Sequence, residues 1–226
     1  MGWLRRFTRG YLMSQACYAI LIDGGFLTKK IQAHHSRAAT ASDIESYCRS
    51  LKSYSEVQNY ELLRIYYYDA LPSTAKTKLP VSKTPHSLAS TLRYRQAQSL
   101  FDTLVMKPGF ALRMGDVRLG PYAWKLKDAV VNGLISKPRT LSDNDFALDL
   151  SQKGVDMRIG LDMARLALRE LVRAVVVVTG DSDFVPAFKF VRREGVKVIL
   201  ATLGHTGVRP ELRAHSDFVI SDPYTP

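Results

Sequence analysis

The residues with the clearest potential for chemistry are two aspartates that directly follow an apolar run. The stretch VVVVTGDSDFVPAF, residues 175–188, begins with four valines and then places Asp181 and Asp183 one residue apart. Four consecutive valines indicate a strand buried on both faces, whereas carboxylates need water, a cationic side chain or a metal ion. The pattern therefore predicts a strand that carries two acids from the core to the edge of a sheet.

Two further aspartates are predicted to reach the same edge. Asp23 ends the apolar run CYAILID, and Asp156 lies at the start of a predicted helix, residues 154–172, that leads into the valine strand. Ligands of an open parallel sheet bind at the carboxyl ends of its strands. Because crossovers between parallel strands are right-handed, the start of this helix should return to that edge.

Four carboxylates at one edge would repel one another and raise their pKa values, unless cationic side chains or a divalent metal ion lie between them. Mg²⁺ binds oxygen ligands, typically one or two carboxylates together with waters and substrate phosphates. Such an ion can activate water and neutralise charge on a phosphate. We therefore interpret Asp23, Asp156, Asp181 and Asp183 as metal-binding and catalytic residues.

Each acid also has a structural interpretation, which the sequence leaves open. Asp23 precedes two glycines and could form a turn, whereas Asp156 and Asp183 could cap helices. A structural role is least expected for Asp181, because its strand is too apolar to be exposed.

Two other acids are harder to assign. Asp162 has Arg158 four residues before it and Arg165 three residues after it, so a surface ion pair explains it best. Asp69 ends the β-rich run LLRIYYYDA and could be a ligand at the edge or a turn residue.

Apolar runs alternate with helical patterns along the chain. The predicted strands are residues 17–23, 62–70, 110–119, 174–180, 196–203 and 217–220. The predicted helices include one with Ser42 as N-cap and Glu45 three residues later, one within 86–106, one at 154–172, one at 184–195 and a short one near 209–215. Strands that are apolar throughout indicate a parallel sheet with helices on both faces.

Other segments are less regular. Residues 71–85 contain three prolines and are predicted to be a loop, and residues 120–150 show no clear pattern. In the 154–172 helix, the predicted core-facing stripe is Met157, Leu161, Ala164, Leu168 and Leu171.

Length and composition exclude several classes of protein. The chain of 226 residues, 46% of them hydrophobic, suits one α/β domain. Its two cysteines, Cys17 and Cys48, form no CxxC pair, which argues against a zinc site or a disulfide framework. No apolar run reaches the roughly 18 residues of a membrane span, and the basic first residues lack the apolar segment of a secretory signal. We expect a cytoplasmic protein with no membrane partner.

The net charge of +11 is unevenly distributed, because residues 71–140 hold twelve Lys or Arg and three Asp. This basic segment, residues 71–140, is predicted to attract a polyanion, although a merely solvated surface would have the same composition. The predicted contacts to the phosphate backbone are Lys76, Lys78, Arg93 and Arg95. Three aromatic residues of the segment, Tyr94, Tyr122 and Trp124, could stack on bases or belong to the core.

Five segments carry a family resemblance when taken in order: AILIDGGF, YYYDALP, KGVDMRIGLDM, VVVVTGDSDFVPAFKFVRREGVKVIL and LRAHSDFVISD. Together they resemble the LabA-like NYN domains, a branch of the PIN-like nuclease superfamily. KGVD followed about twenty residues later by TGDSDF is the most specific part. The resemblance implies a Rossmann-like (PIN-like) three-layer α/β fold, with a central mainly parallel sheet and helices on both faces. It also implies a ribonuclease whose acids bind Mg²⁺ or Mn²⁺ on one rim.

Carried over to this chain, the family's acids fall on Asp23, Asp156, Asp181 and Asp183. The second acid of the KGVD helix falls on Asp162, which the resemblance treats as a supporting site residue rather than an ion-pair partner. Ser182 and Thr179 match the motif around the paired acids and are predicted to orient a metal-bound water or a phosphate.

The chain departs from the family at one position of the site. Many NYN domains have Asn three residues after the first-strand Asp, where this chain has Phe26. The predicted organisation is a basic extension, residues 1–16, and one NYN/PIN-like domain, residues 17–222, with a less family-like middle segment at about 71–150.

We interpret the chain as a Mg²⁺- or Mn²⁺-dependent endoribonuclease acting on single-stranded or structured RNA. The first alternative is an RNA-binding or regulatory module that is catalytically weak because of Phe26. The second is a phosphohydrolase for a small molecule, although such a substrate would not require the basic segment. The oligomeric state is left open, with a homodimer as one option.

Overall fold

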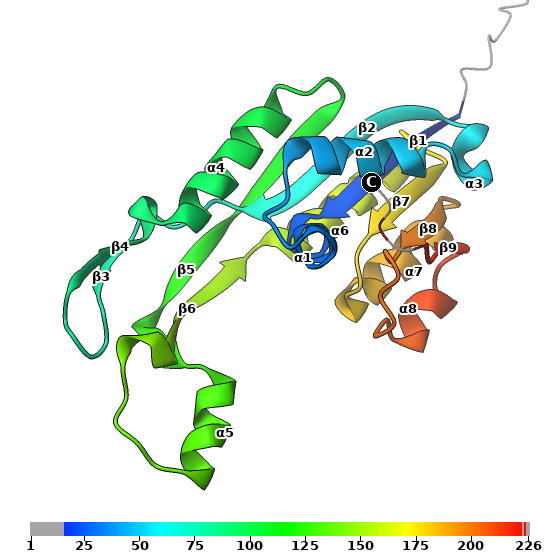
Figure 1. Cartoon of the computed structure of the whole chain (residues 1–226). Coiled ribbons are helices and arrows are strands. Elements are labelled where there is room, and N and C mark those ends of the chain that lie inside the picture. Colours follow the sequence, from blue (N-terminus) through cyan, green and yellow to red (C-terminus); the bar gives the residue numbers. More distant parts are fainter. Residues whose placement is uncertain (1–15, 223, 225–226) are drawn as a thin grey trace, which may run out of the picture.

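The computed structural model describes residues 16–222 and residue 224, and a seven-stranded sheet forms its centre (Figure 1). The sheet contains β1 (Cys17–Asp23), β2 (Glu61–Ala70), β5 (Phe110–Leu126), β6 (Phe146–Lys153), β7 (Ala174–Val178), β8 (Lys197–Ala201) and β9 (Phe218–Ile220). A separate two-stranded hairpin contains β3 (Lys76–Lys78) and β4 (Pro85–Ser87). The predicted basic extension lies outside the described residues, apart from its last residue.

Helices connect most of the parallel strands. They are α1 (Gly24–His35), α2 (Ala41–Leu51), α3 (Ser55–Gln58), α4 (Leu92–Val105), α5 (Asp128–Ser136), α6 (Val155–Leu168), α7 (Val185–Arg193) and α8 (Pro210–Ala214). No helix in the described part of the chain is long and apolar enough to cross a membrane.

The sheet is mainly parallel. Its strand order is β6-β5-β2-β1-β7-β8-β9, and every neighbouring pair is parallel except β5 with β6. The antiparallel pair of β5 and β6 extends beyond the other five strands of the sheet and carries α5 at its far end (Figure 1). The β3–β4 hairpin lies beside this pair. The hairpin, the far part of the β5–β6 pair and α5 therefore form an extension on one side of the domain, whereas α4 of the basic segment packs on the core.

Alternating residues of the central strands pack into two separate hydrophobic cores, one on each face of the sheet. Ile20 of β1 and Val176 of β7 face the core that contains residues of α1, α2 and α4. Their neighbours Leu21 and Val177 face the core that contains residues of α6, α7 and α8. All four side chains are at most 1% exposed, which explains why these strands are apolar throughout. The predicted three-layer α/β fold with helices on both faces is confirmed.

The hairpin in residues 71–85 is a departure from the predicted loop. The indole N–H of Trp124 donates to the carbonyl of Lys78 at 2.9 Å, and its ring packs edge-on against His86, with 5.5 Å between ring centroids. Because Trp124 belongs to β5, this stabilising contact is not encoded in the local pattern of the hairpin.

The neighbouring segments also differ from the sequence analysis. The predicted helix within 86–106 begins only at Leu92, after β4 and a short 3₁₀ turn, Leu88–Ser90. The strand predicted to end at residue 119 continues to Leu126, because β6 pairs with its second half.

Helix α2 begins two residues earlier than predicted. Thr40, not Ser42, is the N-cap, and its side chain accepts a hydrogen bond from the Asp43 N–H at 3.3 Å. Asp43 in turn accepts from the Thr40 N–H at 2.8 Å and pairs with the Arg37 guanidinium at 2.6 and 2.8 Å. The arginine stabilises this capping box over the one predicted with Glu45.

The predicted core-facing stripe of the 154–172 helix is wrong, because α6 has two apolar faces. The face against the sheet contains Val155, Ile159, Met163, Leu166 and Ala167, all of them buried. The predicted stripe points outward: its exposed members are Met157, Leu161, Leu168 and Leu171. Spacing alone could not decide between two apolar faces on the same helix.

Candidate metal and RNA site

The candidate site lies where the order of the strands reverses. The chain passes from β1 to β2 on one side, and returns to place β7 on the other side of β1. Asp23 pairs with Tyr68 of β2, and the preceding Ile22 pairs with Val178 of β7. The carboxyl ends of β1, β2 and β7 therefore meet at a topological switch point, where parallel α/β sheets bind their ligands.

Asp23 is half-buried and has two roles. Its carboxylate accepts a hydrogen bond from the Phe26 N–H at 3.0 Å, which makes it the N-cap of α1, and another from the Thr179 hydroxyl at 3.4 Å. Burial raises the pKa of Asp23 from 3.8 to about 6, and the nearby charges of Asp156 and Asp69 contribute. Ionisation of this carboxyl therefore costs free energy in the folded protein.

The glycine after Asp23 fixes the direction in which the chain leaves β1. A Cβ at Gly24 would lie 2.6 Å from the Tyr67 hydroxyl oxygen and 2.7 Å from the Tyr68 carbonyl oxygen. Because only glycine fits this close approach, α1 can begin directly against β2. This contact holds Asp23 at the edge of the sheet.

Asp156 reaches the same edge from the start of α6. The chain turns at Gly154, whose φ of 77° favours glycine, and enters the helix at Val155. Burial and the charges of Asp181 and Asp183 raise the pKa of Asp156. Asp156 and the paired acids that follow β7 therefore repel one another electrostatically.

The paired acids lie in a turn that Thr179 anchors. Thr179 is fully buried, and its hydroxyl accepts from the Asp181 N–H at 3.1 Å while donating to Asp23. Asp181 accepts from the Asp183 N–H at 2.9 Å and so caps a short 3₁₀ helix that includes Ser182. Thr179 therefore connects the turn after β7 to the end of β1, and its buried hydroxyl orients protein groups rather than facing solvent.

Asp69, whose role the sequence pattern alone does not determine, lies on this edge at the end of β2. It accepts hydrogen bonds from the Ala70 N–H at 2.7 Å, from Gln152 at 3.0 Å and from the Tyr67 hydroxyl at 3.3 Å. Burial raises its pKa, and the charge of Arg93 opposes that rise. The positive charge of Arg93, a residue of the basic segment, therefore acts on this carboxylate. We call the edge that carries Asp23, Asp69, Asp156, Asp181 and Asp183 the acid edge.

Phe26, the departure from the family pattern, lies beside the acid edge. A Cβ at Gly180 would be 2.8 Å from its ring and 2.7 Å from the His205 ring, and the two rings meet edge-on with centroids 5.8 Å apart. The Lys30 ammonium donates to His205 Nδ1 at 3.1 Å. Burial and the charge of Lys30 lower the pKa of His205. The Lys30 ammonium and the His205 imidazole thus border the acids, and the sequence pattern does not indicate this contact.

Asp162 does form an ion pair, but not with the predicted partners. It accepts from Arg113 Nε at 3.1 Å and from the Tyr68 hydroxyl at 2.9 Å. The predicted partner Arg158 instead donates to the Gly154 carbonyl at 3.0 Å. Asp162 thus joins α6 to β2 and β5 through these two contacts.

We expect Asp162→Asn to affect stability more than chemistry. The substitution keeps an acceptor for Tyr68 but removes the charge opposite Arg113, which should cost about 1–2 kcal/mol. A chain of this length should then melt about 3–6 °C lower. Any metal-dependent RNA cleavage should stay within about threefold of wild type after correction for the folded fraction.

Arg113→Met is the matched variant, because it breaks the same pair from the other side. It should lower the melting temperature similarly. If Asp162→Asn abolished cleavage without lowering the melting temperature, Asp162 would belong to the catalytic site instead.

The acid edge fits a hard divalent cation in its chemistry. Its donors are carboxylate and hydroxyl oxygens, and Asp23, Asp156, Asp181 and Asp183 have no Lys or Arg ion-pair partner in the described part of the chain. Within residues 16–222 and 224, however, no three His, Cys, Asp or Glu side chains are close enough to hold one ion together. An ion here would therefore contact at most two of these side chains at a time, and waters or substrate oxygens would supply its other ligands.

The predicted phosphate contacts are exposed. Lys76 and Lys78 lie on the β3–β4 hairpin, and Arg93 and Arg95 lie in the first turns of α4. Within the described residues, none of these four side chains forms an ion pair. Four other cations of the basic segment are paired with acids, namely Lys107, Arg113, Lys125 and Arg139.

The three aromatic residues of the basic segment differ in exposure. Tyr122 is 87% exposed, so it is not a core residue. Tyr94 is half-buried, and Trp124 anchors the hairpin through its indole N–H. Tyr122 is therefore the most accessible of the three as a stacking surface.

The valine strand, the paired acids and the helix of Asp156 belong to a segment with a family match. Residues 123–222 match the NYN domain. The predicted resemblance is thereby confirmed at the level of the NYN domain, which belongs to the PIN-like nuclease superfamily. Asp156, Asp181 and Asp183 lie within the matched segment, whereas Asp23 and Asp69 precede it.

A solved structure resembles the whole domain. It is the crystal structure of a protein of unknown function from Vibrio parahaemolyticus, which is 17% identical with a TM-score of 0.50. The alignment covers 91% of this chain and 92% of that chain, so the likeness extends beyond the NYN segment and concerns the fold. No curated protein sequence matches the chain. The NYN match itself indicates a nuclease-type function related to RNA.

Proposed function

We propose that this protein is a metal-dependent endoribonuclease whose acid edge hydrolyses RNA phosphodiester bonds with Mg²⁺ or Mn²⁺. The observation that supports the proposal is geometric: the ends of β1, β2 and β7 meet at the switch point, and Thr179 joins Asp23 to the turn of the paired acids. Asp23 and Asp156 are destabilised by burial and by neighbouring carboxylates. A divalent cation would relieve that repulsion, and none of the four predicted ligands has a Lys or Arg ion-pair partner in the described part of the chain.

The residues of the acid edge would have different roles in RNA hydrolysis. A bound ion supplies an activated water and neutralises charge on the scissile phosphate. Asp23, Asp156, Asp181 and Asp183 are its candidate ligands, with Asp69 beside them. Thr179 keeps Asp23 and the Asp181 turn in register through its two hydrogen bonds. Arg93, near Asp69, would hold a phosphate of the strand next to the acids.

A catalytically weak RNA-binding module is the alternative that one observation favours. The Phe26 ring closes one side of the edge beside Gly180, where many NYN domains have a polar side chain. The same basic segment would then bind RNA without cleaving it. A measurement of RNA cleavage therefore separates the nuclease from the binding module, whereas a measurement of RNA binding does not.

The test is a cleavage assay on a circular single-stranded RNA, which has no ends and reports internal cleavage. Wild type should cut it with Mn²⁺ or Mg²⁺, and EDTA should stop the reaction. Asp181→Asn should lower the rate by at least about 100-fold, because the loss of a charged ligand removes several kcal/mol of metal-dependent stabilisation. Asp102→Asn, which changes an acid of α4 away from the edge, should cut like wild type.

Binding of the RNA without metal-dependent cleavage would support the module instead. Hydrolysis of a small phosphate ester, but not of RNA, would support the phosphohydrolase. Full RNA cleavage by Asp181→Asn would refute the assignment of that residue.

A further inference from the structure

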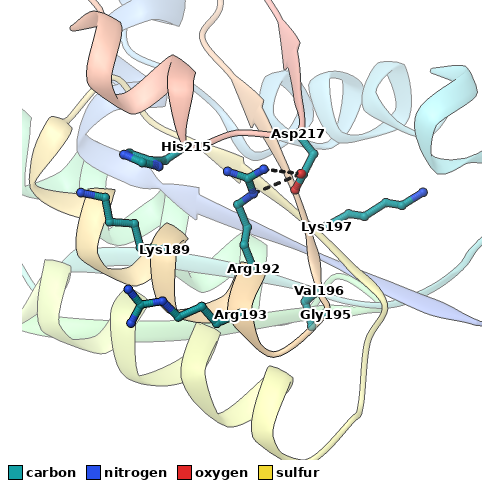
Figure 2. Close-up of a pocket in the computed structure, with 8 residues that line it drawn as sticks. All are labelled: Lys189, Arg192, Arg193, Gly195, Val196, Lys197, His215 and Asp217. Atoms are coloured by element: carbon teal, nitrogen blue, oxygen red, sulfur yellow. Dashed lines mark hydrogen bonds and ion pairs between the residues drawn. The ribbon is translucent and has the colours of Figure 1, made fainter.

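A second charged site lies at the opposite end of the sheet from the acid edge. A cavity of about 420 Å³ opens between the end of α7, the start of β8 and the residues after α8 (Figure 2). It is lined by Lys189, Arg192, Arg193, Gly195, Val196, Lys197, His215 and Asp217. Lys197 begins β8, whereas the aspartates follow the carboxyl ends of β1 and β7. Five residues of parallel strand, about 17 Å, separate the two ends.

One arginine in this cavity is held in place. Asp217 accepts from Arg192 Nε at 3.1 Å and lies 2.9 Å from its Nη2. The other Asp217 oxygen accepts from the Val198 N–H at 2.8 Å, so the backbone of β8 fixes the acid as well. A guanidinium has five N–H donors. Within the described residues, Nη1 of Arg192 has no hydrogen-bond partner, which leaves that side of the group available to an anion.

The remaining lining is strongly cationic. Asp217 is its only carboxylate, against Lys189, Arg192, Arg193 and Lys197. In Figure 2 the heads of Lys189 and His215 lie on the side of Arg192 that faces away from Asp217, whereas Lys197 points in the opposite direction. The ion pair of Lys189 with Glu211 is long, at 3.5 Å, and exposed. The cationic groups therefore exceed what Asp217 can neutralise.

The end of the helix does not account for this arrangement. Cations in the last turn of α7 are attracted by its free carbonyl groups, which can explain Arg192 and Arg193. Lys189 lies a turn earlier, and His215 comes from a different element. Their convergence on one cavity is a feature of the tertiary structure.

We propose that this cavity binds a phosphate group, with the fixed guanidinium of Arg192 as its centre and Lys189 and Arg193 as flexible partners. A planar guanidinium and primary ammonium groups are the side chains that recognise phosphate oxygens. The phosphate can belong to an RNA strand or to a free phosphate or mononucleotide. The proposal does not depend on nuclease activity, because the site is remote from the acid edge and its binding can be measured without divalent metal.

The test compares two double variants of the full chain with equal charge change. Lys189→Gln with Arg193→Gln removes two cationic partners but leaves the Arg192–Asp217 pair intact. Arg165→Gln with Arg169→Gln is the control, because these exposed residues, one in the last turn of α6 and one directly after it, lie outside the cavity. Inorganic phosphate, AMP and a twelve-nucleotide RNA are titrated by calorimetry in EDTA at constant ionic strength.

Wild type and control should bind inorganic phosphate saturably, and the cavity variant at least about fivefold more weakly. If RNA is the natural source, the cavity variant should also lose RNA affinity, and its salt slope should fall by about 1.4, or 0.7 for each lost contact. If a free phosphate or mononucleotide is the source, RNA affinity should match that of the control while phosphate and AMP binding weaken. Either result supports the site, and equal behaviour of the two variants toward all three probes would overturn it.

Discussion

Asp23→Asn should stabilise the metal-free protein at pH 7.5 and also abolish its RNA cleavage. Asparagine keeps an acceptor for the Phe26 N–H and remains a favoured N-cap, so α1 should be unaffected. The charge disappears, however, and with it the cost of ionising a carboxyl whose pKa is raised to about 6 by burial and by Asp156 and Asp69. One pH unit of difference in pKa corresponds to about 1.4 kcal/mol, so the gain is at most about 3 kcal/mol, or about 5–10 °C in melting temperature.

The pH range in which Asp23 ionises determines whether the substitution raises or lowers the stability of the protein. Between pH 3.8 and about 6 the folded protein binds more protons at Asp23 than the unfolded chain, so this residue makes stability fall as pH rises through that window. Above about pH 6 the full cost is present, and the variant should be more stable than wild type. Well below pH 3.8 the carboxyl is neutral in both states, so the difference should become small at pH 3.5 and vanish at lower pH.

Thermal melts at pH 3.5, 5 and 7.5, with and without Mn²⁺, measure both parts of this prediction. Mn²⁺ should raise the melting temperature of wild type more than that of the variant, and cleavage should fall by at least about 100-fold. A variant that melts below wild type at pH 7.5 would contradict the proposed carboxylate repulsion. An equal Mn²⁺ effect in both proteins would exclude Asp23 as a ligand.

Reversing the charges of Lys76, Lys78, Arg93 and Arg95 should weaken RNA binding by at least about 100-fold at low salt. These side chains are exposed and without ion pairs in the described structure, so they are free to contact phosphates. Each lost contact should also reduce the salt slope of the affinity by about 0.7. Filter binding of single-stranded RNA at several salt concentrations, in EDTA, measures both quantities.

A matched control reverses four exposed cations elsewhere, Arg49, Lys52, Arg64 and Arg209, and changes the net charge equally. It should reduce affinity far less, because long-range attraction is screened within about 10 Å at 0.1 M salt. Equal losses in the two variants would show that net charge, rather than the basic segment, determines binding.

The fold could be predicted largely from apolar pattern. Strand β1 occupies the predicted residues, and the valines of β7 are buried on both faces, because a strand covered by helices must be apolar throughout. The helix of Asp156 was also predicted, but not which of its faces packs inward. Both faces of α6 are apolar, and the choice depends on contacts with β2 and β5 that a local pattern does not contain.

The same limit applies to the candidate site. Acids that follow apolar strands could be recognised from their position, and Thr179 joins Asp23 to the turn of Asp181 and Asp183. Among the described residues, however, no three acids are close enough to hold one ion. Asp69 could not be assigned, because its environment depends on Gln152, which is 83 residues away in the sequence. The contact of Lys30 with His205 spans 175 residues, and nothing near either residue indicates it.

The position of β1 between β2 and β7 also affects when the acid edge can form. The hydrogen bond from Thr179 to Asp23 joins residues 156 positions apart. Strand β1 therefore cannot complete its pairing until β7, which is synthesised much later, is present. Closing so long a loop is slow, because the chain loses conformational entropy before the pairing of the two strands stabilises the closed loop. A nascent chain therefore has no assembled acid edge until most of its length has been translated, so the proposed nuclease would be inactive on the ribosome that makes it.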